Sequence, residues 1–137
     1  MLHPMSEPSV PLARWGKDHW SLLAYIETVC VDKHGEIDLQ RMRCDPDRHP
    51  QFLYLRGIGD ELACKTKYPT LLKGGELPDH DDWDCLDDLE AVGLVENIGF
   101  TMEPRYTMTE RGHGVVAALR KHKASGGKFA EFAFSEV

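Results

Sequence analysis

The clearest pattern in the chain is a repeat of apolar side chains at every third position in segment 81–92, which predicts a helix. Asp79 or Asp81 is placed to cap its start, and acids in the first turn suit the positive end of the helix dipole. Gly93 is placed to end it. The apolar face of this helix consists of Trp83, Leu86, Leu89 and Val92.

A hairpin and a closing helix are predicted after this segment. Residues 94–98 form a strand, residues 99–104 a turn and residues 105–108 the returning strand. Thr109 is a good N-cap for a helix that runs to Lys123 and carries basic residues near its negative end.

The pattern upstream is weaker. A broad apolar face predicts a helix over 18–31, followed by a very short strand at 36–38 and a short helix at 39–43. Residues 44–79 read as a long irregular insertion, with a hairpin that turns at Gly74-Gly75.

Length and composition favour one compact domain. The chain has 137 residues, of which 42% are hydrophobic and 28% charged, the balance of a globular protein. Residues 1–16 contain several prolines and no periodicity, so they are predicted to form a flexible arm before a domain at 17–124. Residues 125–137 are predicted to be a flexible tail, anchored by Phe129, Phe132 and Phe134.

Two passages resemble a known family. The run Leu86 to Glu96, which ends in Gly-Leu-Val-Glu, and the run Tyr106 to Gly112 are similar to the helix-wing-helix passage of winged helix-turn-helix proteins, especially MarR-like and PadR-like regulators. The resemblance covers roughly residues 82–123, about a third of the chain. It implies an α+β winged-helix domain, with a three-helix core, a two-stranded wing and a long insertion before the third helix. It also implies DNA binding, with helix 81–92 in the recognition position.

The distribution of charge modifies this expectation. The net charge is −7, and the segment from Glu76 to Glu90 holds eight acids and no Lys or Arg, so the rest of the chain is close to neutral. Carboxylates on a helix that enters the major groove would be repelled by phosphate. If the protein is a DNA-binding regulator or accessory protein, its contacts are expected at Arg41, Arg43, Arg105 and Arg111.

An alternative function uses the acids themselves. The acid-rich helix could dock on a basic nucleic-acid-binding protein, as an adaptor or a DNA mimic. In this hypothesis the partner is a protein, and the interface consists of Asp81, Asp82, Asp84, Asp87 and Asp88.

Zinc is a candidate cofactor. Cys30, His34, Cys44 and His49 are all zinc-ligand types, separated by three, nine and four intervening residues. The alternative is that the cysteines are buried thiols, because neither pair has the tight CxxC spacing. Weaker alternative ligands are Cys64, His80 and Cys85.

No enzyme activity is predicted. Neither a nucleophile elbow, nor an HExxH motif, nor a glycine-rich phosphate loop occurs.

No apolar run reaches the 18 or so residues that cross a bilayer, and Met1–Pro11 does not resemble a secretory signal, so a cytoplasmic protein without membrane partners is expected. A homodimer is compatible with the sequence, since the phenylalanine tail could exchange between subunits.

Overall fold

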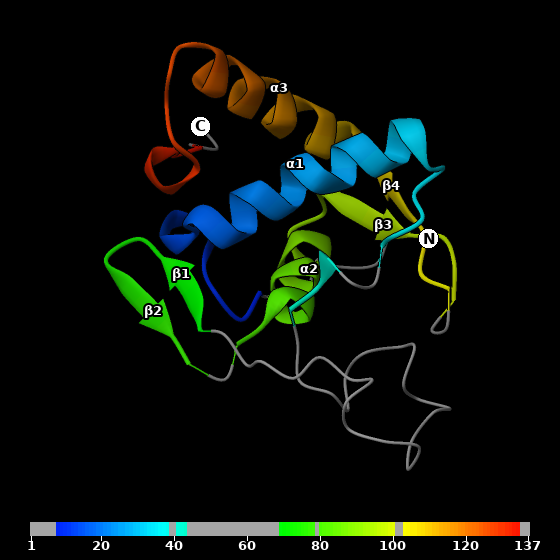
Figure 1. Cartoon of the computed structure of the whole chain (residues 1–137), viewed down its shortest axis with the longest axis horizontal. Coiled ribbons are helices and arrows are strands. Elements are labelled where there is room, and N and C mark those ends of the chain that lie inside the picture. The colour runs from blue at the N-terminus through cyan, green and yellow to red at the C-terminus, as the bar shows by residue number, and fades with distance from the viewer. Residues whose placement is uncertain (1–7, 39–40, 44–68, 79, 101–102, 135–137) are drawn as a thin grey trace.

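Helix α1 (Lys17–Asp32) runs through the centre of the protein, and the other elements pack around it (Figure 1). The computed structural model describes residues 8–38, 41–43, 69–78, 80–100 and 103–134. Helices α2 and α3, strands β1 and β4 and the short 3-10 helix η6 (Phe129–Glu131) all contact α1. The residues of α1 that face them are largely apolar, including Trp20, Leu23 and Ile26, and are almost fully buried.

Helix α2 (Asp82–Ala91) confirms the periodicity of segment 81–92. Its N-cap is Asp81, whose side chain accepts a hydrogen bond from the Asp84 amide while the Asp84 carboxylate accepts one from the Asp81 amide. This reciprocal capping box satisfies two backbone donors at the start of the helix. Gly93, at φ 80°, turns the chain out of the helix as predicted.

The hairpin and the closing helix are also confirmed. Strands β3 (Val95–Asn97) and β4 (Tyr106–Met108) pair antiparallel, with Val95 opposite Met108. Helix α3 (Glu110–Ala124) begins at Thr109, whose hydroxyl accepts a hydrogen bond from the Gly112 amide. In place of the predicted short strand at 36–38, a single bridge joins Glu36 to Arg105, the residue before β4.

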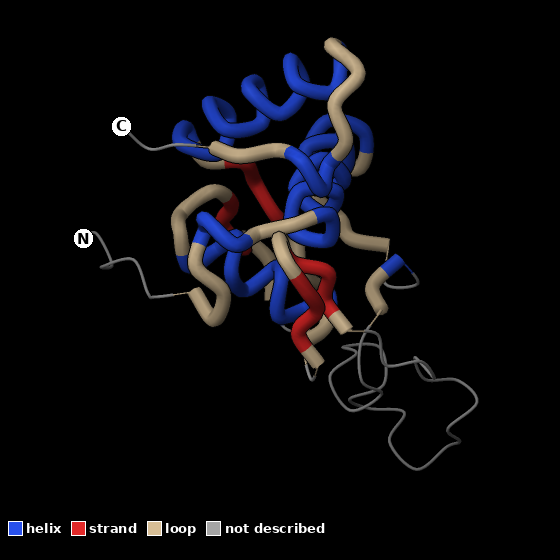
Figure 2. Tube along the Cα trace, turned by 90° about the vertical axis from the view of Figure 1, so that its left-hand side faces the viewer, coloured by secondary structure: helices blue, strands red, loops and turns tan. Residues whose placement is uncertain are grey.

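A second antiparallel pair, β1 (Thr70–Leu72) and β2 (Gly75–Leu77), forms the predicted hairpin at the other end of α1. Figure 2 shows the two pairs as separate sheets. The architecture is therefore α+β, with three α-helices and two small sheets among the described residues. Its order α2-β3-β4-α3 is compatible with a winged-helix-like layout. Residues 39–40 of the predicted second helix and residues 44–68 of the insertion lie outside the described residues.

Both terminal segments differ from the predicted flexible arm and tail within the described residues. Val10 and Trp15 are buried, and the Trp15 indole Nε1 donates to the Val10 carbonyl at 2.9 Å. A short 3-10 helix, η1 (Leu12–Arg14), lies between them. At the other end, Phe132 packs edge-on against Trp20, with ring centroids 4.8 Å apart. These large apolar side chains hold the termini on the core because exposing them to water would cost free energy.

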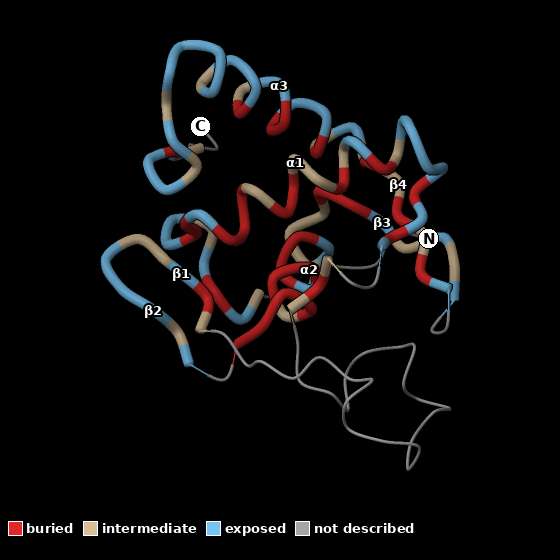
Figure 3. Tube along the Cα trace, in the orientation of Figure 1, coloured by how far each residue is buried: buried red, intermediate tan, exposed pale blue. Residues whose placement is uncertain are grey.

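Burial is uneven among the helices, as Figure 3 shows. Six of the ten residues of α2 are buried, whereas α3 buries only one face, with Val115, Val116 and Leu119. None of the helices in the described part of the chain has the length and apolar character needed to span a bilayer.

Candidate functional site

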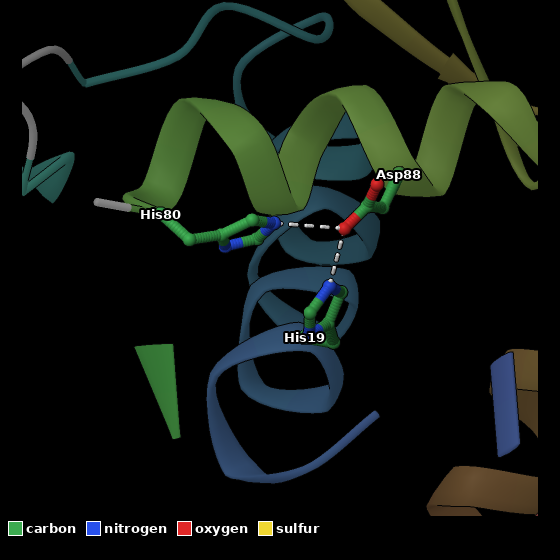
Figure 4. A group of neighbouring side chains, drawn as sticks. All are labelled: His19, His80 and Asp88. Carbon is green, nitrogen blue, oxygen red and sulfur yellow. Dashed lines mark hydrogen bonds and ion pairs between the residues drawn. The ribbon is translucent and has the colours of Figure 1, made fainter. Parts of the chain in front are cut away.

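Two histidines and an aspartate meet in the core between α1 and α2 (Figure 4). His19 lies on α1, His80 directly precedes the N-cap of α2, and Asp88 lies on α2. His19 Nε2 is 2.8 Å and His80 Nε2 3.1 Å from the same atom, Asp88 Oδ2. The three residues are 0%, 5% and 1% exposed, so the Asp88 carboxyl group meets the two imidazole rings inside the protein. We call these three residues the buried cluster.

Local structure explains why the cluster forms. His19 stands on the buried stripe of α1, four and seven positions before Leu23 and Ile26. The capping box at Asp81 fixes the start of α2, and the His80 side chain extends from that start along the helix toward Asp88. The Trp15 ring stacks on His19, with centroids 4.7 Å apart and planes 12° apart.

The N-terminal segment closes the cluster on one side. The Ser9 amide and hydroxyl both lie within hydrogen-bond distance of Asp88 Oδ1, at 2.7 and 2.8 Å. The same hydroxyl oxygen is 3.0 Å from His80 Nε2. Ser9 itself is exposed, so it lies between the buried cluster and the solvent.

Burial and hydrogen bonding set the ionisation of the cluster. Burial lowers the pKa of His19, and the hydrogen bond to Asp88 opposes this only in part. Burial alone would raise the pKa of Asp88, but hydrogen bonds from His19 and Ser9 and the close approach of the His80 ring outweigh it and hold that pKa well below its usual range. Asp88 is therefore a carboxylate at neutral pH, beside a neutral His19.

Cys85 and Thr70 border the cluster. Cys85 Sγ is 3.8 Å from Thr70 Oγ1, 3.9 Å from His19 Nδ1 and 4.0 Å from His80 Nδ1. Cysteine, histidine and aspartate together can form a catalytic site in which the cysteine thiol is the nucleophile. Cys85, however, is fully buried, and burial raises the pKa of its thiol. Because the thiolate is the reactive form, this arrangement favours an inert cysteine.

We accordingly expect iodoacetamide to leave Cys85 unmodified in the folded protein and to alkylate it after unfolding in urea. Mass spectrometry of the digested protein measures both reactions on the same residue, and the unfolded sample serves as the control. Labelling of Cys85 at equal rates in the two states would show that its thiol is accessible and would contradict this assignment.

A second buried charge centre lies at the start of α2. Asp82 is 3% exposed and accepts hydrogen bonds from Arg43, at 2.9 Å from Nη2 and 2.8 Å from the amide. Arg43 Nη2 also pairs with Asp18 at 3.0 Å, and Arg41 reaches Asp82 at 3.4 Å. Asp82, the first residue of α2, is thus paired with cations within the fold.

These contacts change the predicted interfaces. Five acids were predicted to form a docking surface. Three of them, Asp81, Asp82 and Asp88, are buried and cannot contact a partner directly. Asp84 is half-buried in the capping box and Asp87 is exposed. The physical reason is that cap bonds and internal partners draw the short side chains inward.

The four predicted DNA contacts are dispersed. Arg41 and Arg43 are held against the acids of α1 and α2, as described above. Arg105 bonds to Glu36 at 3.2 Å on the surface, and Arg111 is half-buried on α3. The structure therefore does not gather them into one interface.

The predicted zinc ligands are only partly described. The Cys30 thiol donates to the Tyr106 carbonyl at 3.0 Å, and His34 is exposed in a left-handed turn at φ 55°. Cys44 and His49 lie outside the described residues. Within the described part of the chain, one group of three residues could hold a metal ion, with ligand atoms within 4.8 Å of one another; it is the buried cluster.

Sequence reasoning missed the cluster as a unit. It treated His80 as a weak zinc candidate and Asp88 as a surface contact, and it gave His19 no place in a site. A usable signal exists, because His19 and Asp88 are polar residues next to apolar positions of the two helices, His19 beside Trp20 and Asp88 beside Leu89. Their pairing across 69 positions has no signature in the sequence.

No protein-family model matches this chain, and neither a curated protein nor a solved structure matches it.

Proposed function

We propose that the chain is a non-catalytic binding module of winged-helix type, and that it contacts nucleic acid through one basic end of the molecule. The order α2-β3-β4-α3 supports the winged-helix layout, as does the bridge from Glu36 to Arg105, which adds a third short segment to the hairpin. The buried, protonated Cys85 thiol supports a function without nucleophilic catalysis.

Helix α2 is poorly suited to reading a DNA groove. Six of its ten residues are buried, and its exposed positions include Asp87 and Glu90. A groove-reading helix needs exposed donors or neutral polar groups along one face. We therefore place the nucleic-acid contact elsewhere.

The observation that carries the proposal is a convergence of cations at one end of the protein. The start of α1, the β1–β2 turn, the end of α3 and η6 lie at the same end (Figure 1). The Lys73 amide bonds to the Arg14 carbonyl at 3.0 Å, and His122 Nε2 donates to the Lys128 carbonyl at 2.8 Å. The resulting basic end consists of Arg14, Lys17, Lys73, Lys121, Lys123 and Lys128.

The charge of the opposite end has the other sign. The end of α1, the β3–β4 hairpin and the start of α3 meet there (Figure 1). Their exposed acids are Asp32, Glu36, Asp38, Glu96, Glu103 and Glu110, against Lys33, Arg105 and Arg111. At the basic end the exposed acids on the same elements are Glu76 and Glu131. Because the acidic and basic side chains lie at opposite ends, the electrostatic potential is positive at the basic end although the protein as a whole is acidic. Phosphate groups would approach this end.

Removing two cations from the basic end should weaken binding to duplex DNA. For Lys17→Gln with Lys121→Gln we expect affinity to fall about tenfold at low salt, because each lost phosphate contact forfeits counterion release. The slope of log K against log salt should become shallower by about 1.8, or about 0.9 per contact. Fluorescence anisotropy of a labelled duplex across a salt series measures both quantities.

A matched control removes two cations from the other end. Lys33→Gln with Arg105→Gln changes the net charge equally and should leave affinity within about twofold, the size of a weak long-range effect. An equal loss in both variants would exclude the basic end as the contact. Absence of binding by the wild-type protein at about 50 mM salt, where phosphate contacts are strong, would overturn the proposed function.

A further inference from the structure

We propose that His19, His80 and Asp88 form a structural binding site for a divalent transition-metal ion, with zinc as the best fit. The metal site does not include any residue of the basic end. An experiment can therefore refute the metal site without refuting nucleic-acid binding, and the reverse. Three ligand atoms from three separate segments, His19 Nε2, His80 Nε2 and Asp88 Oδ2, converge in the core.

The hydrogen bonds around His80 determine which of its two ring nitrogens carries a proton. Thr70 Oγ1 lies 2.7 Å from the His80 carbonyl oxygen and 2.7 Å from His80 Nδ1. The carbonyl can only accept, so the single hydroxyl proton of Thr70 belongs to it, and Nδ1 must donate its own N–H to Thr70. In a neutral imidazole, Nε2 then carries a lone pair.

That lone pair faces another acceptor. His80 Nε2 is 3.1 Å from Asp88 Oδ2, a carboxylate oxygen that also has no proton to offer. The Ser9 hydroxyl is near both residues, but its one proton can serve His80 Nε2 or Asp88 Oδ1 and not both. The cluster is therefore short of one positive charge between His80 and Asp88, which a metal ion would supply.

The surroundings of the rings suit metal binding. A ligating histidine usually donates its second ring N–H to a fixed acceptor, as His80 does to Thr70. For His19 the corresponding nitrogen, Nδ1, faces the Cys85 sulphur at 3.9 Å.

The donor set selects the ion. Two imidazole nitrogens and one carboxylate oxygen are ligands typical of zinc, with bonds of about 2.0–2.1 Å in a tetrahedral arrangement. Such a geometry separates ligand atoms by about 3.3 Å. The two nitrogen-to-oxygen separations of 2.8 and 3.1 Å need to open by only a few tenths of an ångström, and the two imidazole nitrogens lie within 4.8 Å of each other. The Ser9 hydroxyl or a water molecule completes the fourth position.

The role of the ion would be structural. It would join α1, the segment before α2 and α2 itself, beneath the N-terminal segment that carries Ser9. Binding energy at such a site adds directly to folding energy, because the unfolded chain has no preformed ligand set.

The test is the metal content of the purified, untagged full-length protein. We expect about one zinc ion per chain in the wild type by plasma mass spectrometry, and at least tenfold less in His80→Asn and Asp88→Asn. The control His113→Asn changes an exposed histidine of α3 and should retain the ion. Circular dichroism establishes that each variant is folded.

Cobalt substitution tests the ligands without any mutation. Co²⁺ in the wild-type site should give the visible bands of tetrahedral cobalt without the near-ultraviolet sulphur charge-transfer band, since the ligands are nitrogen and oxygen. Three results would overturn the proposal. They are a folded wild type without zinc that also fails to take up Zn²⁺ or Co²⁺, a sulphur band in the cobalt protein, or zinc that is lost from Cys44→Ser and kept by His80→Asn. The first result would leave the cluster with an extra proton in place of the metal.

Discussion

Replacing Asp88 with alanine is expected to lower the free energy of unfolding by about 2–5 kcal/mol, because several donors lose a buried acceptor at about 1–3 kcal/mol each. The carboxylate is 1% exposed, and donors from Ser9 and His19 point at it together with the His80 ring. Without it, the polar groups of three segments lose their shared acceptor inside the core. The loss is large against the 5–15 kcal/mol or so that stabilises a typical domain.

Urea denaturation followed by circular dichroism measures this effect. Glu90→Ala is the matched control, because it removes an exposed acid from the same helix and should change stability by no more than about 0.5 kcal/mol. If Asp88→Ala cost less than about 1 kcal/mol, the cluster would not be holding the segments together.

Replacing Gly112 with alanine should destabilise the protein by about 1–3 kcal/mol, the range for an overpacked core. Gly112 lies in the first turn of α3, directly against the β3–β4 hairpin. An added methyl group would lie 2.6 Å from the Met108 sulphur and 2.9 Å from the Leu94 carbonyl carbon, and closer still to the Leu94 oxygen. The backbone atoms cannot give way without moving α3 off the hairpin.

Gly114 provides the opposite result two residues along the same helix. A methyl group there meets nothing within 4 Å, so Gly114→Ala should raise the free energy of unfolding by about 0.5–1 kcal/mol through helix propensity alone. Thermal and urea melts of the two variants side by side give the comparison. Equal effects of the two substitutions would show that α3 does not approach the hairpin as described.

Elements with local signals could be predicted from the sequence. The apolar repeat and the Asp81 cap defined α2, and Thr109 defined the start of α3, because caps and periodicity act within one or two turns. The turn after α2 followed from Gly93 for the same reason.

Features that depend on distant contacts could not be predicted. The acids of α2 lie close together in the sequence and suggest a charged surface, but Asp82 pairs with Arg43 and Asp88 with His19 only after the chain has folded. The pairing of Phe132 with Trp20 likewise joins residues at opposite ends of the chain. Such partners leave no mark in local spacing, so the tail and the acid-rich helix were both expected to be more exposed than they are.

Amide NMR of the isotope-labelled protein tests directly whether nucleic acid contacts the basic end, as proposed. During titration with a short duplex at about 50 mM salt, where phosphate contacts are strong, we predict that shift changes will gather at the basic end defined above. Lys17, Lys73, Lys121 and Lys128 should be among the residues affected. Shift changes confined to the β3–β4 hairpin and α2, or none at a concentration that saturates anisotropy, would contradict this assignment.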